Sequence, residues 1–270
     1  MKLGAFLAAH AAGSPDKIAV RCGADTITFR ELDEAGDRLA DALGNLGLVP
    51  GDRVALFLPS CIAFVQCFAA AVKAGFVCVP ISNRLTDAEV AVILDDCRPR
   101  AIVFNGDTRA PFAAAAASAP GILRVACDTA RGDELSLETL IASGAPGPRA
   151  ALPVEIDDCM ICYTSGTTGR PKGAIITHAN VAVLNGFVQR CQLGLTPNDV
   201  LLATTSIGLR TGFNPHQRQS LRSYDCYQPS PGGVAEAVFF HSQDITQALR
   251  QQTGIDALFF RLIKPVDCQD

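Results

Sequence analysis

The sequence contains one stretch that predicts both a chemistry and its place in a fold, Tyr163-Thr164-Ser165-Gly166-Thr167-Thr168-Gly169-Arg170-Pro171-Lys172-Gly173. Hydroxyl side chains, glycines and two cations are concentrated here, between the apolar runs 159–163 and 174–176. Glycines let several backbone N–H groups converge, hydroxyls add neutral donors, and a lysine adds a mobile positive charge. The stretch therefore predicts a loop that binds a polyphosphate and is delivered at the carboxyl end of a strand.

The composition describes a globular chain that acts on small molecules. Its 270 residues, 49% of them hydrophobic, are enough for one large domain or two modest ones. A net charge of −4 and a pI near 5.6 give no electrostatic footprint for nucleic acid or an anionic membrane. Gln66 and Lys73 interrupt the most apolar region, so we expect no membrane span. Eleven scattered cysteines fit buried thiols in a reducing compartment, which predicts a cytoplasmic protein.

Strand and helix patterns alternate along the first half of the chain. A hairpin is expected over 18–22 and 26–29, and the capping-box patterns Thr28–Glu31 and Thr86–Glu89 each predict the start of a helix. The expected strands are 53–58, 76–79, 101–104 and 122–126, and the expected helices between and after them are 61–74, 86–97, 111–119 and 136–142. This alternation predicts an α/β fold with a mainly parallel sheet and helices on both faces.

Composition also suggests where the chain divides. The linker-like run 143–148, SGAPGP, separates a first α/β subdomain (1–145) from a segment with the loop-bearing strand and the helix after it (146–213). Residues 214–270 are divergent, because they hold eight of the eleven glutamines and show no clean period. We expect that last segment to be a poorly determined tail.

The residues around the lysine separate two kinds of phosphate loop. A Walker A loop has glycine directly before its lysine and serine or threonine directly after it. Here Pro171 precedes Lys172 and Gly173 follows it. Proline has no backbone N–H to offer a phosphate, so the spacing disfavours a plain nucleotide hydrolase.

The run 164–173, together with Thr177-His178-Ala179-Asn180, resembles the phosphate-loop signature of the AMP-forming adenylating superfamily. That superfamily includes acyl-CoA synthetases, aryl-CoA ligases and luciferases. Upstream, the runs 28–32, 51–56 and 73–80 are also similar to the N-terminal domain of this family. The resemblance covers residues 1–213.

The resemblance implies an ATP-dependent carboxylate–CoA ligase. In such enzymes a carboxylate attacks the α-phosphate of ATP, with Mg²⁺, and coenzyme A then displaces AMP from the acyl-adenylate. The implied partners are thus ATP, Mg²⁺, coenzyme A and a small carboxylic acid. The residues that would hold phosphates are the hydroxyl donors Thr164, Ser165, Thr167 and Thr168, the glycines Gly166 and Gly169, and the cation Lys172. No catalytic residue and no oligomeric state is assigned.

Two further signals are weaker. Cys159 and Cys162 have a spacing that is seen in metal sites, but residues three apart on a regular strand point to opposite faces, so we expect no metal there. His178 follows the expected strand after the loop. It either lines the site or caps the next helix, and we favour the cap.

The resemblance ends after Phe213. Leu209 stands where the family commonly carries a histidine or an aromatic residue, and the family's later adenine-, ribose- and hinge-associated motifs are not found downstream. We hypothesise that residues from about 214 onward reflect a shifted reading frame or a rearranged gene end, which would make the chain a truncated ligase. The alternative is an inactive fragment that at most binds nucleotide.

Overall fold

The structure is a computed structural model. It describes residues 2–115, 121–147, 157–164, 171–187, 200–203 and 238–241, and in 183–187, 200–203 and 238–241 it describes the backbone alone. The elements, in chain order, are α1 (Leu3–Gly13), β1 (Ile18–Cys22), β2 (Asp25–Thr28), α2 (Phe29–Asn45), β3 (Arg53–Phe57), α3 (Ile62–Ala74), β4 (Val77–Pro80), α4 (Asp87–Cys97), β5 (Ala101–Phe104), α5 (Gly106–Ala115), β6 (Leu123–Ala126), β7 (Leu135–Ser136), α6 (Leu137–Ser143), β8 (Asp158–Thr164), β9 (Lys172–Thr177), α7 (His178–Phe187), β10 (Val200–Ala203) and β11 (Val238–His241).

Seven of the described strands form one sheet in the order β7-β6-β5-β3-β4-β8-β9. All neighbours pair in parallel except β8 and β9, which are antiparallel. β8 joins the sheet beside β4, where Cys78 pairs with Met160. The prediction of a mainly parallel α/β sheet is confirmed, and the strand before the polar loop is part of it.

Four other described strands form a smaller antiparallel sheet in the order β10-β11-β1-β2. The hairpin β1-β2 lies where the sequence predicts it. β11, which falls within the segment 214–270, pairs with β1 so that Val20 lies opposite Phe240. The proposed division of the chain at 145/146 and 213/214 remains a prediction.

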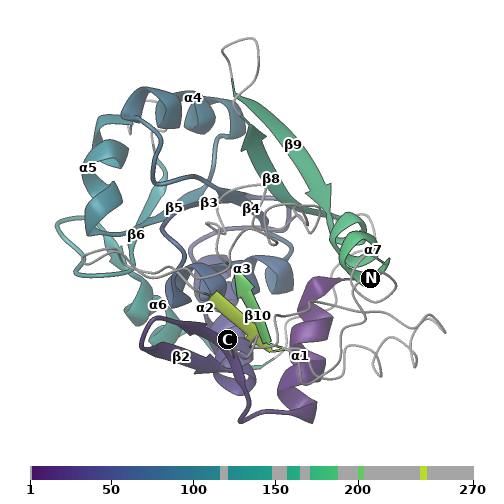
Figure 1. The fold of residues 1–270 in the computed structure, drawn as a ribbon. Coiled ribbons are helices and arrows are strands. Elements are labelled where there is room, and N and C mark those ends of the chain that lie inside the picture. Colours follow the sequence, from purple (N-terminus) through teal and green to yellow (C-terminus); the bar gives the residue numbers. More distant parts are fainter. Residues whose placement is uncertain are drawn as a thin grey trace, which may run out of the picture.

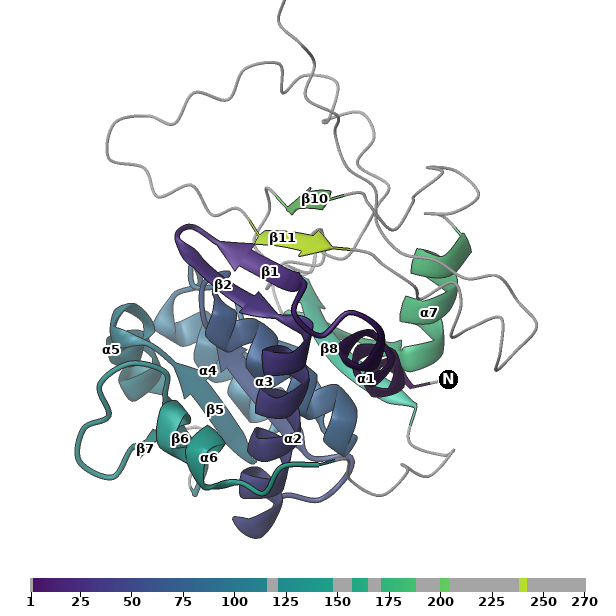
Figure 2. The same cartoon turned by 90° about the horizontal axis from the view of Figure 1, so that it is seen from below.

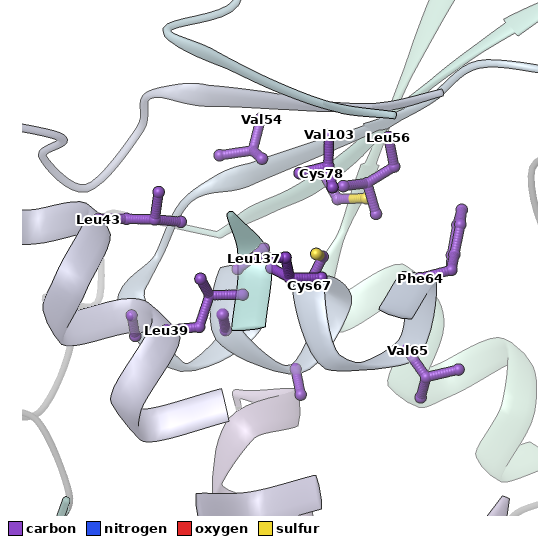
Figure 3. Packing of buried hydrophobic residues seen from close by; sticks show 14 of the residues in the cluster. Leu39, Leu43, Val54, Leu56, Phe64, Val65, Cys67, Cys78, Val103 and Leu137 are labelled. Carbon is purple, nitrogen blue, oxygen red and sulfur yellow. The ribbon is translucent and has the colours of Figure 1, made fainter. Parts of the chain in front are cut away.

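Helices cover both faces of the larger sheet, as Figures 1 and 2 show. On one face α2, α3 and α6 enclose a cluster of buried apolar residues with β3 and β5. In Figure 3, Leu39 of α2 and Cys67 of α3 lie on the helix side of this cluster, and Leu56 and Val103 lie on its strand side. On the other face α4 and α5 pack on Phe57, Phe104 and their neighbours. The strands are thus buried on both sides, which explains their almost continuous apolar sequences.

Local sequence signals fix where the helices begin and end. Both predicted capping boxes are present: the Thr28 backbone N–H donates to Glu31 Oε2 (2.8 Å), and the Thr86 N–H donates to Glu89 Oε2 (2.9 Å). α3 ends at Gly75, whose φ of 73° is in the left-handed region that favours glycine. In each capping box the threonine hydroxyl also accepts from the backbone N–H of the glutamate. The two bonds of a box satisfy backbone N–H donors that the first turn of a helix leaves unpaired.

The helix expected over 111–119 begins earlier, at Gly106. Asn105 and Thr108 form a reciprocal pair in which each backbone N–H donates to the other side chain over 3.1 Å. This cap precedes Pro111, which lies inside the helix. The predicted start of this helix at Pro111 was therefore wrong, because the cap formed by Asn105 and Thr108 outweighs the preference of proline for a first turn.

A buried ion cluster at Lys73 joins α3 to α2, and α1 packs closely beside it. Its ammonium lies 2.7 Å from carboxylate oxygens of both Asp33 and Asp37, and the Lys73 and Asp37 side chains are each 7% exposed. Gly36 lets α2 approach closely, since a Cβ there would lie 3.1 Å from Ala69 Cβ. Gly4 of α1 lies equally close to the Lys73 backbone. The ion pairs join α2 to α3, and the close approaches at Gly36 and Gly4 bring α2 and α1 against α3.

We expect Lys73→Met to lower the free energy of unfolding by about 3 kcal/mol, because it removes the cation that lies 2.7 Å from the buried Asp37 and the partly buried Asp33. Chemical unfolding of the purified chain measures the change. The matched control is Arg30→Met, which breaks an ion pair with Asp16 whose side chains are 53% and 86% exposed; its cost should stay below about 1 kcal/mol. Equal effects of the two variants would contradict the role of burial.

Candidate phosphate-binding site

The hairpin β8-β9 holds the two ends of the polar loop opposite each other. In its antiparallel register Thr164, the last residue of β8, pairs with Lys172, the first residue of β9. The structure therefore brings together the first and the last of the predicted phosphate-binding residues. The five between them, Ser165, Gly166, Thr167, Thr168 and Gly169, lie outside the described residues.

Thr164 and Lys172 lie where a ligand can reach them from solvent. Lys172 is exposed, and Thr164 is half-buried. β9 is the last strand at its end of the described sheet, while β8 is anchored to β4 on its other side. A cation and a hydroxyl thus stand at the open end of a strand pair whose base is embedded in the core.

Gly173 lies directly across from Tyr163 and is closely covered by it. A Cβ at position 173 would lie 3.1 Å from Tyr163 Cζ and 2.8 Å from Cγ2 of Ile161. At the second distance either the Ile161 side chain or the strand has to shift. The glycine after the lysine is therefore favoured by the packing of Ile161 and Tyr163 and not by a left-handed backbone.

A cavity of about 600 Å³ separates the loop end of the hairpin from the end of α4. The hairpin contributes Tyr163, Gly173 and Ile175, and α4 with its following turn contributes residues 95–98. The Tyr163 hydroxyl crosses to this helix end and donates a hydrogen bond to the Asp96 carboxylate. Burial, and then this bond, raise the pKa of Tyr163, so the hydroxyl remains a donor. Figure 1 shows α4 beside that end of the hairpin.

His178 does not cap α7. Thr177 and Asn180 form the cap, because Thr177 Oγ1 accepts from the Asn180 N–H at 2.9 Å and Asn180 Oδ1 accepts from the Thr177 N–H at 3.1 Å. The His178 side chain is fully buried, and its Nδ1 accepts a hydrogen bond from the Leu3 N–H at 3.1 Å. Our interpretation of His178 as the capping residue was wrong; it fastens the start of α1 to the start of α7, which lie side by side in Figures 1 and 2.

The residues that flank the base of the hairpin, Asp157 before β8 and His178 after β9, bond to the start of the chain and to each other. Lys2 Nζ lies 3.6 Å from an Asp157 carboxylate oxygen just before β8, and the Asp157 carbonyl accepts from the His178 N–H at 2.8 Å. Burial lowers the pKa of His178 to about 4, and the charge of Lys2 contributes to this. The imidazole is therefore neutral near pH 7, with its proton on Nε2, because Nδ1 is the acceptor.

The two cysteines of β8 lie in one buried cluster. Cys159 and Cys162 both pack with Met160 and Val72, contrary to the expectation that they point to opposite faces. The reason is a register shift between Asp158 and Met160, which interrupts the alternation of the strand. Burial raises the pKa of the Cys159 thiol to about 12. Among the described residues, no group of three or more His, Cys, Asp or Glu side chains is placed to hold a metal ion.

The family model described as AMP-binding enzyme matches residues 7–216. The chain belongs to this family. The match includes the parallel sheet, the hairpin β8-β9 and α7, and it ends close to Phe213, where the resemblance read from the sequence ends. The predicted membership of the AMP-forming superfamily is confirmed.

Individual relatives are CoA ligases for fatty and aromatic acids. Over 157 residues the chain is 36% identical to long-chain-fatty-acid–CoA ligase FadD13 of Mycobacterium tuberculosis, covering 57% of this chain and 30% of the relative. It is 28% identical over 251 residues to benzoate–CoA ligase of Thauera aromatica, covering 91% and 46%. The crystal structure of a benzoate CoA ligase from Burkholderia xenovorans superposes with a TM-score of 0.64 at 28% identity, covering 74% and 39%.

The chain spans less than half of the length of each of these three relatives. The match to the benzoate ligase of Thauera aromatica also enters the segment 214–270, because 91% of the chain cannot fit within its first 213 residues. In the part of the chain that the structure describes, no helix is long and apolar enough to cross a bilayer.

We expect Gly173→Ala to destabilise the chain by about 1 kcal/mol or more, because the new Cβ overlaps Ile161 and displaces the Tyr163 ring. Thermal unfolding and amide hydrogen exchange of β9 measure the effect. Gly13→Ala is the control: it lies at the end of α1 with nothing within 4 Å of its Cβ, and it should leave stability unchanged or raise it. A Gly173→Ala protein as stable as the control would refute the packing argument.

We expect the free energy of unfolding to fall by about 2 to 3 kcal/mol on account of His178 as the pH drops from 6.5 to 4. In that window the unfolded histidine, with its ordinary pKa near 6.5, takes up a proton that the folded one, with a pKa of about 4, does not. Urea unfolding across this range measures the slope.

The comparison variant is His178→Asn, which keeps an acceptor for the Leu3 N–H but does not titrate. Carboxylates titrate in the same range in both proteins, so the difference between the two curves isolates the histidine. Parallel curves would contradict a buried neutral His178.

Proposed function

We propose that residues 164–172 hold the β- and γ-phosphates of ATP in an AMP-forming carboxylate–CoA ligase. The observation that carries the proposal is the pairing of Thr164 with Lys172 at the open end of a hairpin that is rooted in the parallel sheet. This pairing keeps Thr164 and Lys172 next to each other across the hairpin. Membership of the AMP-binding enzyme family supports the identity of the ligand.

The reaction has two steps. A carboxylate oxygen attacks the α-phosphorus of ATP, the bond from that phosphorus to the bridging oxygen of pyrophosphate breaks, and an acyl-adenylate forms. A thiol then attacks the acyl carbonyl, and AMP leaves with the electrons of the acyl–oxygen bond. Negative charge builds on the departing pyrophosphate in the first step, which is where a fixed cation and hydroxyl donors stabilise the transition state.

Within this scheme each loop residue has a role set by its chemistry. Lys172 supplies the positive charge, and Thr164, Ser165, Thr167 and Thr168 supply hydroxyl hydrogen bonds. Gly166 and Gly169 let the backbone come close to the phosphate oxygens. Lys172 meets one requirement directly, since its side chain is exposed at the end of β9 and is free to reach outward.

Magnesium fits this site only as a companion of the phosphates. The described residues provide no cluster of acidic side chains or histidines that would hold the ion by themselves. Mg²⁺ is commonly bound by one or two carboxylates together with substrate phosphates. We therefore derive no step of the reaction from a protein-held metal.

The remaining assignments follow from the relatives. Their names specify long-chain fatty acids and benzoate, so we propose a carboxylic acid with an apolar body as substrate and coenzyme A as the thiol. We also propose a cytoplasmic location, in keeping with eleven cysteines in the sequence, eight of which are free thiols among the described residues.

The proposal predicts release of pyrophosphate when the chain is given ATP, Mg²⁺ and a panel of fatty and aromatic acids. Lys172→Ala should slow this release at least about tenfold and weaken ATP binding by a similar factor, because it removes a charge from the leaving group. A coupled pyrophosphate assay and calorimetric titration with ATP provide the measurements. Arg30→Ala, which removes an exposed cation from α2, should change neither.

Three results distinguish the candidates. Acid-dependent pyrophosphate release supports the ligase. ATP binding that depends on Lys172, without release, supports an inactive fragment that binds nucleotide. Release of inorganic phosphate without any acid would identify a nucleotide hydrolase and overturn the proposal.

A further inference from the structure

The hydrogen bond between Tyr163 and Asp96 connects two parts of the fold that are 67 residues apart in sequence. Tyr163 directly precedes Thr164, the first residue of the proposed phosphate loop. Asp96 is in the last turn of α4, a helix whose Val90, Ile93 and Leu94 are at most 1% exposed in the core. The bond therefore ties the start of the loop to a rigid element.

The same tyrosine also controls the end of the loop. Its ring covers Gly173, the residue after Lys172, and a Cβ at that position would lie 3.1 Å from Tyr163 Cζ. The ring is thus adjacent to both ends of the loop, to Thr164 along the chain and to Gly173 across the hairpin. Aromatic cover of a cross-strand glycine is a recognised way of fixing the register of a strand pair.

The hydrogen bond between Tyr163 and Asp96 lies beside a cavity under the hairpin. About 600 Å³ lies between the loop end of the hairpin and the end of α4, so packing does not fill this space. Asp95 lines the same cavity on the neighbouring position of the helix. Across this gap the Tyr163 hydroxyl reaches Asp96 and fixes the distance between the hairpin and the helix.

We propose that Tyr163 and Asp96 are a positioning pair that holds both ends of the phosphate loop in the geometry that binds polyphosphate. The proposal rests on the proposed function of the loop. Both residues act through their neighbours: fixing residues 164 and 172 beforehand lowers the conformational entropy that these two residues lose when a polyphosphate binds.

The test uses the 270-residue chain with Tyr163→Phe, Asp96→Ala and the double variant. Tyr163→Phe keeps the ring over Gly173 and removes the hydroxyl alone. Calorimetric titration with Mg·ATP and with pyrophosphate should show about tenfold weaker binding for each single variant, and less than additive loss in the double variant, because both single variants remove the hydrogen bond between Tyr163 and Asp96. Asp95→Ala, the matched control, should stay within about twofold of the parent chain.

Two other measurements separate positioning from stability. Amide hydrogen exchange in residues 172–177 should become faster in Tyr163→Phe and Asp96→Ala but not in Asp95→Ala. Titrations are carried out well below the unfolding midpoint of each variant, where a contact that only adds stability leaves the affinity unchanged. Asp96→Asn, which preserves the shape of the side chain, replaces Asp96→Ala if the latter does not fold.

The outcomes distinguish this proposal from the one on which it rests. If the parent chain binds nucleotide and both single variants bind it equally well, the positioning pair is refuted. If the parent chain binds neither Mg·ATP nor pyrophosphate, the proposed function fails and the positioning pair is overturned with it.

Discussion

The antiparallel pairing of β8 with β9 is the constraint on which the site depends. β8 is held by the parallel sheet through β4, whereas β9 is held by β8. Whatever fixes the register of this pair also fixes the distance between Thr164 and Lys172. A shift by one residue would send Lys172 to the other face of the hairpin, because side chains alternate along a strand.

Two groups of contacts protect that register, one at each end of the hairpin. At the base, Leu3 and Lys2 bind His178 and Asp157, so the N-terminal helix closes over the start of β8 and the start of α7. At the loop end, Tyr163 covers Gly173 and reaches α4. The base is filled by apolar side chains and thiols, while the loop end borders a cavity. This contrast is what a phosphate loop needs, since its support must be rigid and its surroundings open to ligand.

The relatives place these features in a wider setting. The family match runs from residue 7 to 216 and so contains β4, the described sheet neighbour of the hairpin, and α4, the helix that Tyr163 contacts. The sequence motif predicts a polyphosphate loop, and the family is described as AMP-binding enzyme. What the fold adds is the connection of the hairpin to distant residues: Tyr163 at its loop end bonds Asp96, 67 positions away, and His178 just after its base bonds Leu3, 175 positions away.

The sequence by itself determined the features that arise from neighbouring residues. The capping boxes at Thr28 and Thr86, the parallel α/β alternation and the composition of the loop all depend on contacts within a few positions, so local chemistry reveals them.

Tertiary structure alone decided which distant residues meet. The partners of Tyr163 and His178 depend on how strands and helices are placed in space, and spacing along the chain carries no trace of that. Cys159 and Cys162 show the same limit: one register shift in β8 places both thiols in one cluster, because a bulge forms through pairing with β9 and not through the strand's own sequence.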